Sequence, residues 1–454
     1  MSVWWAEHAW LGEEHAEQGV LIKTAGGTIT RVDRNVLTPP EGATILRGLT
    51  LPGLVNAHSH AFHRALRGRT QAERGTFFTW RERMYNVASR LEPDTYYALA
   101  RATFTEMLLA GITTVGEFHY LHHRPDGTPY ASPTAMAMAV ARAATDAGIR
   151  LTLLDTCYLR GGFGLGPDDP HVPLSPAQLR FGDGTAIAWS ERATLTHQQL
   201  ESATVRVGAA VHSVRAVPAE DLRTVADWAH AHTAPIHVHV SEQPAENEDC
   251  QNIYGCSPTE LLARHGVLDH LASAVHATHL TVTDVQLLAT NGASACFCVT
   301  TERDLADGIG PAAQLAAAGV NLTVGSDSHA VIDLFEETRG IELGERVRSG
   351  HRGYFRACDL LESATSRGAA SLGWPELGRL IVGALADFVT VSPDSVRMAG
   401  AEPKTFLETV VFAAVASDVH HVVVNGVTVV EKGTHVRYPN VVADLTRAIT
   451  SVCT

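Results

Sequence analysis

Eight short apolar runs alternate with longer segments of helical periodicity through the middle of the chain, and this alternation is what most constrains the fold. The gaps between the runs are long enough for helical crossovers, which parallel strands require. Eight parallel strand and helix units of this kind close into a (β/α)8 barrel, the TIM barrel of the α/β class. The predicted strands are 51–58, 112–118, 149–156, 205–212, 235–242, 272–279, 293–299 and 320–327. The predicted helices between them are 94–110, 133–147, 218–232, 281–290 and 310–318.

The two ends of the chain have a different pattern. Short β-like runs are separated there by Gly-Gly and Asn-Gly pairs, which predict hairpins. Neither end is long enough to form a core alone, so we expect residues 1–50 and 380–454 to combine into one small β-sandwich domain beside a barrel domain of residues 51–379. The segment 157–195 is rich in Gly, Pro and Asp and longer than an ordinary loop, and it is predicted to be a lid over the barrel mouth.

The composition excludes several classes of partner. Of the 454 residues, 35 are Lys or Arg and 49 are Asp or Glu, which gives a net charge of −14 at pH 7. This charge repels phosphate backbones and anionic lipids, so we expect no nucleic acid and no membrane surface as a partner. No apolar run approaches the roughly 18 residues of a membrane span, and the N-terminus lacks the features of a signal peptide. We therefore expect a cytoplasmic protein; the oligomeric state is open, with a homodimer as one alternative.

The cysteine and lysine contents exclude further kinds of chemistry. The seven cysteines include no C-x-x-C pair, so they are predicted to be reduced thiols and not a disulfide framework or a thiolate zinc site. The only three lysines are Lys23, Lys404 and Lys432, so none lies between residues 51 and 378. This excludes Schiff-base and pyridoxal enzymes, and also barrel hydrolases that bridge two metals with a carboxylated lysine.

Histidines and carboxylates cluster at the ends of the predicted strands, where the active site of a barrel lies. His58 and His60 end the first strand, and because residues i and i+2 of a strand point to the same side, both face the barrel mouth. The sequence has 24 histidines and three H-x-H pairs, and roughly one such pair is expected by chance. Any single group here could be a hydrogen-bonded core residue, but their combination predicts a metal site. The other strand-end groups are His239, Glu242, His276 and Asp327.

The segment Pro52-Gly53, followed by His58 and His60, resembles the opening signature of the amidohydrolase superfamily. The resemblance extends over nearly the whole chain, to the closing segment 383–387. It implies one divalent metal ion per chain, and the implied ligands are His58, His60, His239 and Asp327. It also implies catalytic roles in proton transfer, and the implied residues are Glu242, His276 and Asp327.

The end of the fourth predicted strand indicates which branch of the superfamily the chain resembles. This strand ends in His212 and not in a lysine, which is typical of the single-metal deaminases. Three histidines and one carboxylate with an open position suit Zn²⁺, with Fe²⁺ and Mn²⁺ as alternatives. His237 is an alternative ligand, because it also points inward by strand parity.

Five segments narrow the resemblance to the formiminoglutamate deiminases of that superfamily. These segments are 58–64, 78–83, 117–120, 211–215 and 325–329. The resemblance implies that four residues hold the two carboxylates of the substrate, namely Arg81, Tyr120, His212 and Arg215. Arginine is the planar, bidentate partner for a carboxylate, although either arginine could instead be a surface residue. His63 stands where that family is expected to have glutamine, so its contact with the substrate is open.

Together these residues predict a metal-dependent hydrolase, and the resemblance implies that it acts on a non-peptide C–N bond of a linear amidine. The resemblance implies that a metal-activated hydroxide converts N-formimino-L-glutamate, a small dicarboxylate, to N-formyl-L-glutamate and ammonia in histidine degradation. One alternative is another single-metal aminohydrolase, such as a guanine or cytosine deaminase, which would need aromatic stacking in the barrel mouth and fewer arginines. A second alternative is a non-catalytic barrel that serves as a binding protein, which would be expected to have lost metal ligands.

Overall fold

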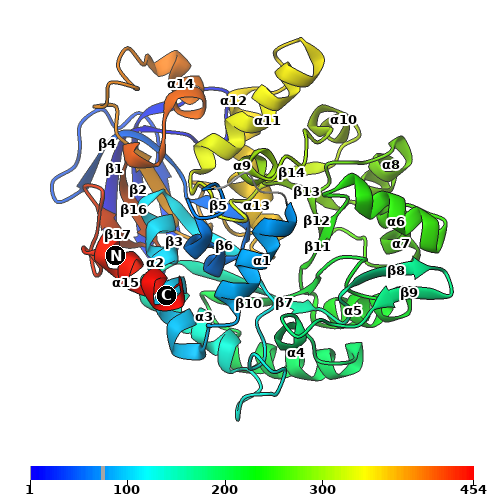
Figure 1. The fold of residues 1–454 in the computed structure, drawn as a ribbon. Helices are drawn as coiled ribbons and strands as arrows, with labels where there is room; N and C mark the ends of the chain where they lie inside the picture. Colours follow the sequence, from blue (N-terminus) through cyan, green and yellow to red (C-terminus); the bar gives the residue numbers. More distant parts are fainter. Residues whose placement is uncertain (1, 73–76, 454) are drawn as a thin grey trace.

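A barrel of parallel strands forms the centre of the protein (Figure 1), which a computed structural model describes over residues 2–72 and 77–453. Its eight strands are hydrogen-bonded in the order β14-β13-β12-β11-β10-β7-β6-β5. An isolated parallel bridge between Ser59 and Asp327 joins the first strand to the segment after the last one, so the sheet is nearly closed. The strands are β5 (Leu54–Ser59), β6 (Ile112–His119), β7 (Arg150–Cys157), β10 (Val205–Val211), β11 (Ile236–Val240), β12 (Ala272–His276), β13 (Ser294–Phe297) and β14 (Asn321–Val324). The predicted TIM barrel is confirmed.

The predicted strand 51–58 is wrong in one respect, because it spans two different sheets. Leu51 and Pro52 end β4 (Thr44–Pro52), which belongs to the terminal sheet, and the barrel strand begins at Leu54. The chain crosses between the sheets at Gly53, whose backbone N–H donates to the carbonyl of Asp387. A β-carbon at Gly53 would lie 2.2 Å from Oγ1 of Thr113, so the crossing requires glycine.

Helices surround the barrel, and the five predicted ones are present. They are α2 (Pro93–Leu109), α3 (Ala135–Ala147), α5 (Ala219–His232), α8 (Val282–Asn291) and α10 (Ala312–Ala317). The other helices along the barrel segment are η1 (Ala61–Leu66), α1 (Phe77–Ala88), η2 (Leu179–Phe181), α4 (Ala186–Leu200), α6 (Pro244–Tyr254), α7 (Pro258–Arg264), α9 (Val299–Asp304), α11 (Leu334–Ser349), α12 (Ala357–Ser363) and α13 (Ser366–Ser371).

The segment 157–195 is not one long loop. It contains a hairpin of β8 (Gly162–Gly166) and β9 (Asp169–Val172), the short helix η2 and the first part of α4. Thr185 caps α4 by accepting from the backbone N–H of Ala188, and Trp189 on its inner face is fully buried. The lid prediction therefore applies to the hairpin region at most, because α4 is one of the helices packed around the barrel.

The strands near the two chain ends form a second sheet beside the barrel, and both termini lie on this side of the molecule (Figure 1). Its order is β18-β17-β16-β15-β4-β1-β2-β3. Besides β4, its strands are β1 (Ser2–Ala9), β2 (Glu17–Ala25), β3 (Thr28–Asp33), β15 (Phe388–Val391), β16 (Val419–Val424), β17 (Val427–Glu431) and β18 (Thr434–His435). The predicted Gly-Gly and Asn-Gly hairpins are the β2–β3 and β16–β17 connections. The domain boundaries at residues 50 and 380 stay a prediction.

The C-terminal segment also contains helices that the β-like pattern does not predict. They are η3 (Pro403–Thr405), α14 (Phe406–Ala413), η4 (Ala416–Asp418) and α15 (Val441–Cys453). The buried side chains of α15 are Leu445, Ala448, Ile449 and Val452, which have the i, i+3, i+4, i+7 spacing of one helix face. Among the described residues, no helix combines the length and the apolar character needed to cross a bilayer.

A buried ion pair links the barrel to the terminal sheet. Arg150, the first residue of β7, donates from Nε to Oδ2 of Asp387 at 2.7 Å, and each side chain is only 1% exposed. The guanidinium also donates to Oδ1 of Asn425, in the Asn-Gly turn between β16 and β17. Asp387 in turn accepts from the backbone N–H of Asn425 at 2.7 Å. Both charges are thus satisfied at the junction of the two sheets.

We expect Asp387→Asn to lower the free energy of unfolding by about 3–5 kcal/mol, because it leaves the Arg150 charge buried without a counter-ion. Denaturant unfolding followed by circular dichroism measures this change. Asp227→Asn is the matched control, because Asp227 pairs with Arg223 at the surface with side chains 57% and 68% exposed. Equal destabilisation by the two variants would contradict a special role of the buried pair.

Candidate active site

Four of the predicted site residues converge in the barrel mouth. His58 on β5, His60 just after it, His239 on β11 and Asp327 after β14 each offer a ligand atom, and these atoms lie within 4.8 Å of one another. Nε2 of His58 is 3.1 Å from Nε2 of His239 and 3.2 Å from Oδ1 of Asp327. Nε2 of His60 is 3.3 Å from the same Oδ1. All four residues are buried.

The hydrogen bonds of these imidazoles fit a metal ion. His60 donates from Nδ1 to the carbonyl of Phe118 at 3.0 Å, and His239 donates from Nδ1 to the carbonyl of His212 at 2.9 Å. Because a carbonyl can only accept, each Nε2 keeps its lone pair. Burial lowers the pKa of both histidines well below the usual range, which keeps the rings neutral. Lone pairs that converge in this way beside a carboxylate oxygen suit a cation between them, and three imidazoles with one carboxylate are a suitable donor set for a divalent metal.

Close backbone approach positions Asp327 beside the first strand. The backbone N–H of Asp327 donates to the carbonyl of His58, and the N–H of His60 donates to the carbonyl of Asp327. A β-carbon on Gly325 would lie 2.7 Å from Cβ of His58, so only glycine allows the strands to approach this closely. Asp327 has φ of 41°, in the left-handed region that non-glycine residues seldom adopt. Such strain is typical of functional sites, where surrounding contacts hold it in place.

A buried polar network lies directly behind the H-x-H pair, and the sequence analysis did not identify it. Ser59, between the two histidines, donates to Oε2 of Glu117 at 2.6 Å and contacts Nε2 of His329 at 3.1 Å. The other oxygen of Glu117 accepts from the backbone N–H of Ala61 at 2.7 Å. Burial raises the pKa of Glu117 to about 8, against the effect of these donors. The network ties β5 to β6 and to the loop after β14, and so fixes the position of the H-x-H segment.

Glu242 and His276 lie next to the four-residue cluster. Oε1 of Glu242 is 3.7 Å from Nε2 of His276, whose ring stacks on His239 with centroids 5.6 Å apart. Burial lowers the pKa of His276, but the carboxylates of Glu242, Glu302 and Asp327 outweigh burial and raise this pKa well above the usual value. Glu302, 3.5 Å from Nδ1 of His276, was not predicted, because nothing local in the sequence distinguishes it.

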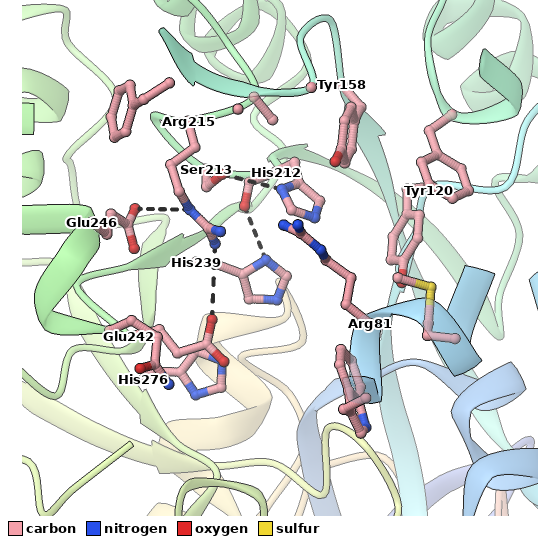
Figure 2. A pocket seen from close by; sticks show the side chains of 18 of the residues that line it. Arg81, Tyr120, Tyr158, His212, Ser213, Arg215, His239, Glu242, Glu246 and His276 are labelled. Atoms are coloured by element: carbon pink, nitrogen blue, oxygen red, sulfur yellow. Dashed lines mark hydrogen bonds and ion pairs between the residues drawn. The ribbon is translucent and has the colours of Figure 1, made fainter. Parts of the chain in front are cut away.

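A cavity of about 450 Å³ opens over the cluster, in the size range of small-molecule sites. Figure 2 shows Arg81, from α1, and Arg215, from the turn after β10, extending into it from different walls. All of the predicted substrate-binding and proton-transfer residues line this cavity: His63, Arg81, Tyr120, His212, Arg215, Glu242, His276 and Asp327. Aromatic residues that the sequence analysis missed complete the lining: Trp80, Tyr85, Tyr158, Phe163 and Phe181.

The polar groups of the cavity contact one another. Nε2 of His63 is 3.0 Å from the hydroxyl of Tyr120, and Nδ1 of His212 is 3.2 Å from Oγ of Ser213. Burial lowers the pKa of His63 to about 3, so this ring is neutral near pH 7. His237, the alternative metal ligand, lies outside the cluster: its Nε2 donates to the carbonyl of Ser371 at 3.0 Å.

Comparison with known proteins identifies the family of the chain. A model of the amidohydrolase family matches residues 49–429. The chain belongs to the amidohydrolase family. This amidohydrolase is 37% identical over 447 residues to a formimidoylglutamate deiminase of Pseudomonas aeruginosa, and the match covers 96% of each chain. It is 28% identical over 390 residues to a 5-methylthioadenosine/S-adenosylhomocysteine deaminase of Pelotomaculum thermopropionicum, over 85% of this chain and 81% of the relative.

A solved structure agrees with these relationships. The crystal structure of an amidohydrolase from Brucella melitensis superposes with a TM-score of 0.90 and 34% identity, over 100% of both chains. The resemblance predicted from the sequence is thereby confirmed. The family and the buried cluster support one divalent metal ion per chain.

We expect His239→Ala to reduce bound metal well below one ion per chain, because it removes one of four donors from the cluster. Metal analysis of the purified, folded protein measures this. His237→Ala is the control: it removes a buried histidine of the same strand that lies outside the cluster, and should leave metal content unchanged. Full metal content in His239→Ala, with loss in His237→Ala, would assign the ligand role to His237.

Proposed function

We propose that this amidohydrolase hydrolyses N-formimino-L-glutamate to N-formyl-L-glutamate and ammonia, a reaction of histidine degradation. The observation that carries this proposal is that two arginines from separate elements enter the same cavity as the cluster of metal-ligating residues. A substrate with two carboxylates and one amidine carbon needs such an arrangement, since arginine binds carboxylates in a planar, bidentate manner. The name of the Pseudomonas aeruginosa relative, 37% identical over 96% of each chain, supports the same substrate.

We infer that His58, His60, His239 and Asp327 hold the metal ion, and that the ion is zinc, with iron or manganese as alternatives. The three imidazole nitrogens and one carboxylate oxygen fit zinc, which takes nitrogen and oxygen ligands, and iron and manganese accept the same donors. When bound, such an ion would polarise the substrate and lower the pKa of a water molecule to about 7.

Glu242 moves the proton in this mechanism. Its carboxylate takes a proton from the attacking water and returns it to the imine nitrogen, which becomes an amino group on a tetrahedral carbon. It then moves the proton of the new hydroxyl to this amino group, so that the C–N bond breaks, ammonia leaves and the carbon keeps the oxygen of water as a formyl group. His276, 3.7 Å from Oε1 of Glu242, orients the reactants and balances the charge that develops. Asp327 would help His276 to orient the attacking water.

The substrate carboxylates bind to Arg81 and Arg215, assisted by Tyr120, His212 and His63. Because the protein carries a net charge of −14, attraction of an anion depends on these local cations and not on the overall field. Arg215 is well suited to this role, since its contacts with Glu242 and Glu246 are ion pairs of 3.9 Å, longer than hydrogen bonds.

A ring deaminase is the second candidate. The aromatic residues of the cavity provide surfaces for stacking, and the relative from Pelotomaculum thermopropionicum carries the name of a nucleoside deaminase. Ammonia release and product identification by mass spectrometry separate the candidates. We expect metal-loaded protein to form ammonia and N-formyl-L-glutamate from formiminoglutamate, with little activity on adenine or guanine compounds. Formamide and glutamate as products, or preference for a ring, would contradict the proposal.

The Arg215→Met variant provides a second arm of this assay. Loss of one partner of a buried charge pair costs about 2–5 kcal/mol, which corresponds to roughly a 30- to 4,000-fold fall in kcat/KM for formiminoglutamate. A small formimino compound without carboxylates should lose far less. Arg223→Met, which removes a surface arginine 68% exposed, is the control and should change neither activity. Equal losses on both substrates in Arg215→Met would mean that Arg215 stabilises the structure of the site and does not bind the substrate carboxylate.

Glu242→Gln tests the proton-transfer role separately from binding. The amide keeps the shape of the side chain but cannot carry the proton, so turnover should fall about 10²-fold or more while metal content stays unchanged. Steady-state kinetics with metal analysis measures both effects. Turnover near that of the wild type would remove Glu242 from the mechanism.

A further inference from the structure

Glu246 is a buried carboxylate on the wall of the substrate cavity, and the mechanism above gives it no role. It lies in the first turn of α6, is 2% exposed, and lines the cavity on the side of Arg215 (Figure 2). Among the described residues, neither of its oxygens has a hydrogen-bond partner, and Nε of Arg215 also has none. Oε1 of Glu246 and Nε of Arg215 face one another at 3.9 Å. The carboxylate therefore depends on a single, loosely paired cation.

The ionised form of a carboxylate is unfavourable in this position, because the group is buried away from water and has no hydrogen-bond donor. The charged and titratable groups around it are Arg215 after β10, Glu242 after β11, His276 on β12 and Cys250 on the same helix. Burial raises the pKa of Glu246 to about 7 and the charge of Glu242 adds to this effect, while Arg215, the backbone of Glu242 and His276 oppose it. Near neutral pH a small change in its surroundings is therefore enough to change its protonation.

We propose that Glu246 competes with the substrate carboxylate for Arg215, and that Glu246 takes up one proton from solvent when that carboxylate binds. This inference rests on the proposed function, because it assumes a carboxylate on Arg215. Two carboxylates beside one guanidinium repel each other, and the one that lacks hydrogen-bond donors is protonated first. The proton returns to solvent when the product leaves, so the overall reaction is unchanged.

The consequence is a pH dependence of affinity. Below about pH 7 Glu246 is already neutral, so the ligand carboxylate binds Arg215 without competition from Glu246. Above that pH, binding requires uptake of a proton, so the Kd should rise by up to about tenfold per pH unit. If Glu246 only held Arg215 in position, removing its charge would weaken binding at every pH and leave the slope unchanged.

Calorimetric titration of the product, N-formyl-L-glutamate, into the metal-loaded enzyme tests the proposal without turnover. Titrations at pH 7.5 in HEPES and in Tris, whose ionisation enthalpies differ, give the number of protons taken up on binding. We expect the wild type to take up more protons than Glu246→Gln, and expect Glu246→Gln to bind with an affinity that changes little between pH 6.5 and 8.5. Glu248→Gln removes the same charge from an exposed position of α6 and should behave as the wild type.

The possible outcomes are distinct. Equal proton uptake by the wild type and Glu246→Gln overturns the inference and leaves the proposed function intact. Weaker binding by Glu246→Gln, with the same dependence of Kd on pH as in the wild type, has the same meaning. Failure of the folded wild type to bind the product at all overturns both. The wild-type measurement in two buffers needs no variant, so absence of any proton uptake there also overturns the inference even if Glu246→Gln folds poorly.

Discussion

The convergence of three imidazole nitrogens and one carboxylate oxygen within 4.8 Å is the constraint on which the rest of the site depends. Neutral imidazoles repel one another when their lone pairs meet, so the arrangement is stable only around a cation or when other contacts enforce it. The barrel supplies that enforcement. The bridge between Ser59 and Asp327 joins the two ends of the barrel sheet and brings the first and last candidate ligands together, so the same contact serves the sheet and the site.

This coupling explains why so much of the fold and the ligand cluster can be predicted from the sequence. Strand periodicity locates the barrel strands, and the rule that active-site groups follow strand ends then brings His58, His239 and Asp327 together without any structural information. The errors arise where a local pattern does not specify its partner. The apolar run 51–58 fits a strand at every position, yet its first two residues pair in the terminal sheet, because Gly53 allows the chain to cross between sheets.

The parts of the site that could not be predicted are those set by long-range packing. Glu117 on β6 contacts Ser59 and Glu302 on α9 contacts His276; both pairs join separate elements, and no spacing rule identifies them. Glu246 lies four residues after Glu242, a spacing that would place both on one face of a helix. The helix α6 begins only at Pro244, however, so this spacing does not identify Glu246 as a site residue. The aromatic residues of the cavity, such as Tyr158, are as hydrophobic as core residues. The sequence alone therefore does not distinguish a cavity position from a core position.

Arg215 lies near both the residue proposed to transfer the proton and the expected position of the substrate carboxylate. Its guanidinium lies 3.9 Å from the carboxylate of Glu242, which the mechanism uses to move a proton, and 3.9 Å from Glu246, which lies where a ligand carboxylate would compete. In a buried setting each of these charges affects the others strongly, because little water screens them. In the proposed function, a substrate carboxylate on Arg215 would lie close to the carboxylate of Glu242 as well. If Arg215 binds the substrate and Glu242 transfers the proton, as we propose, the two functions meet at one guanidinium.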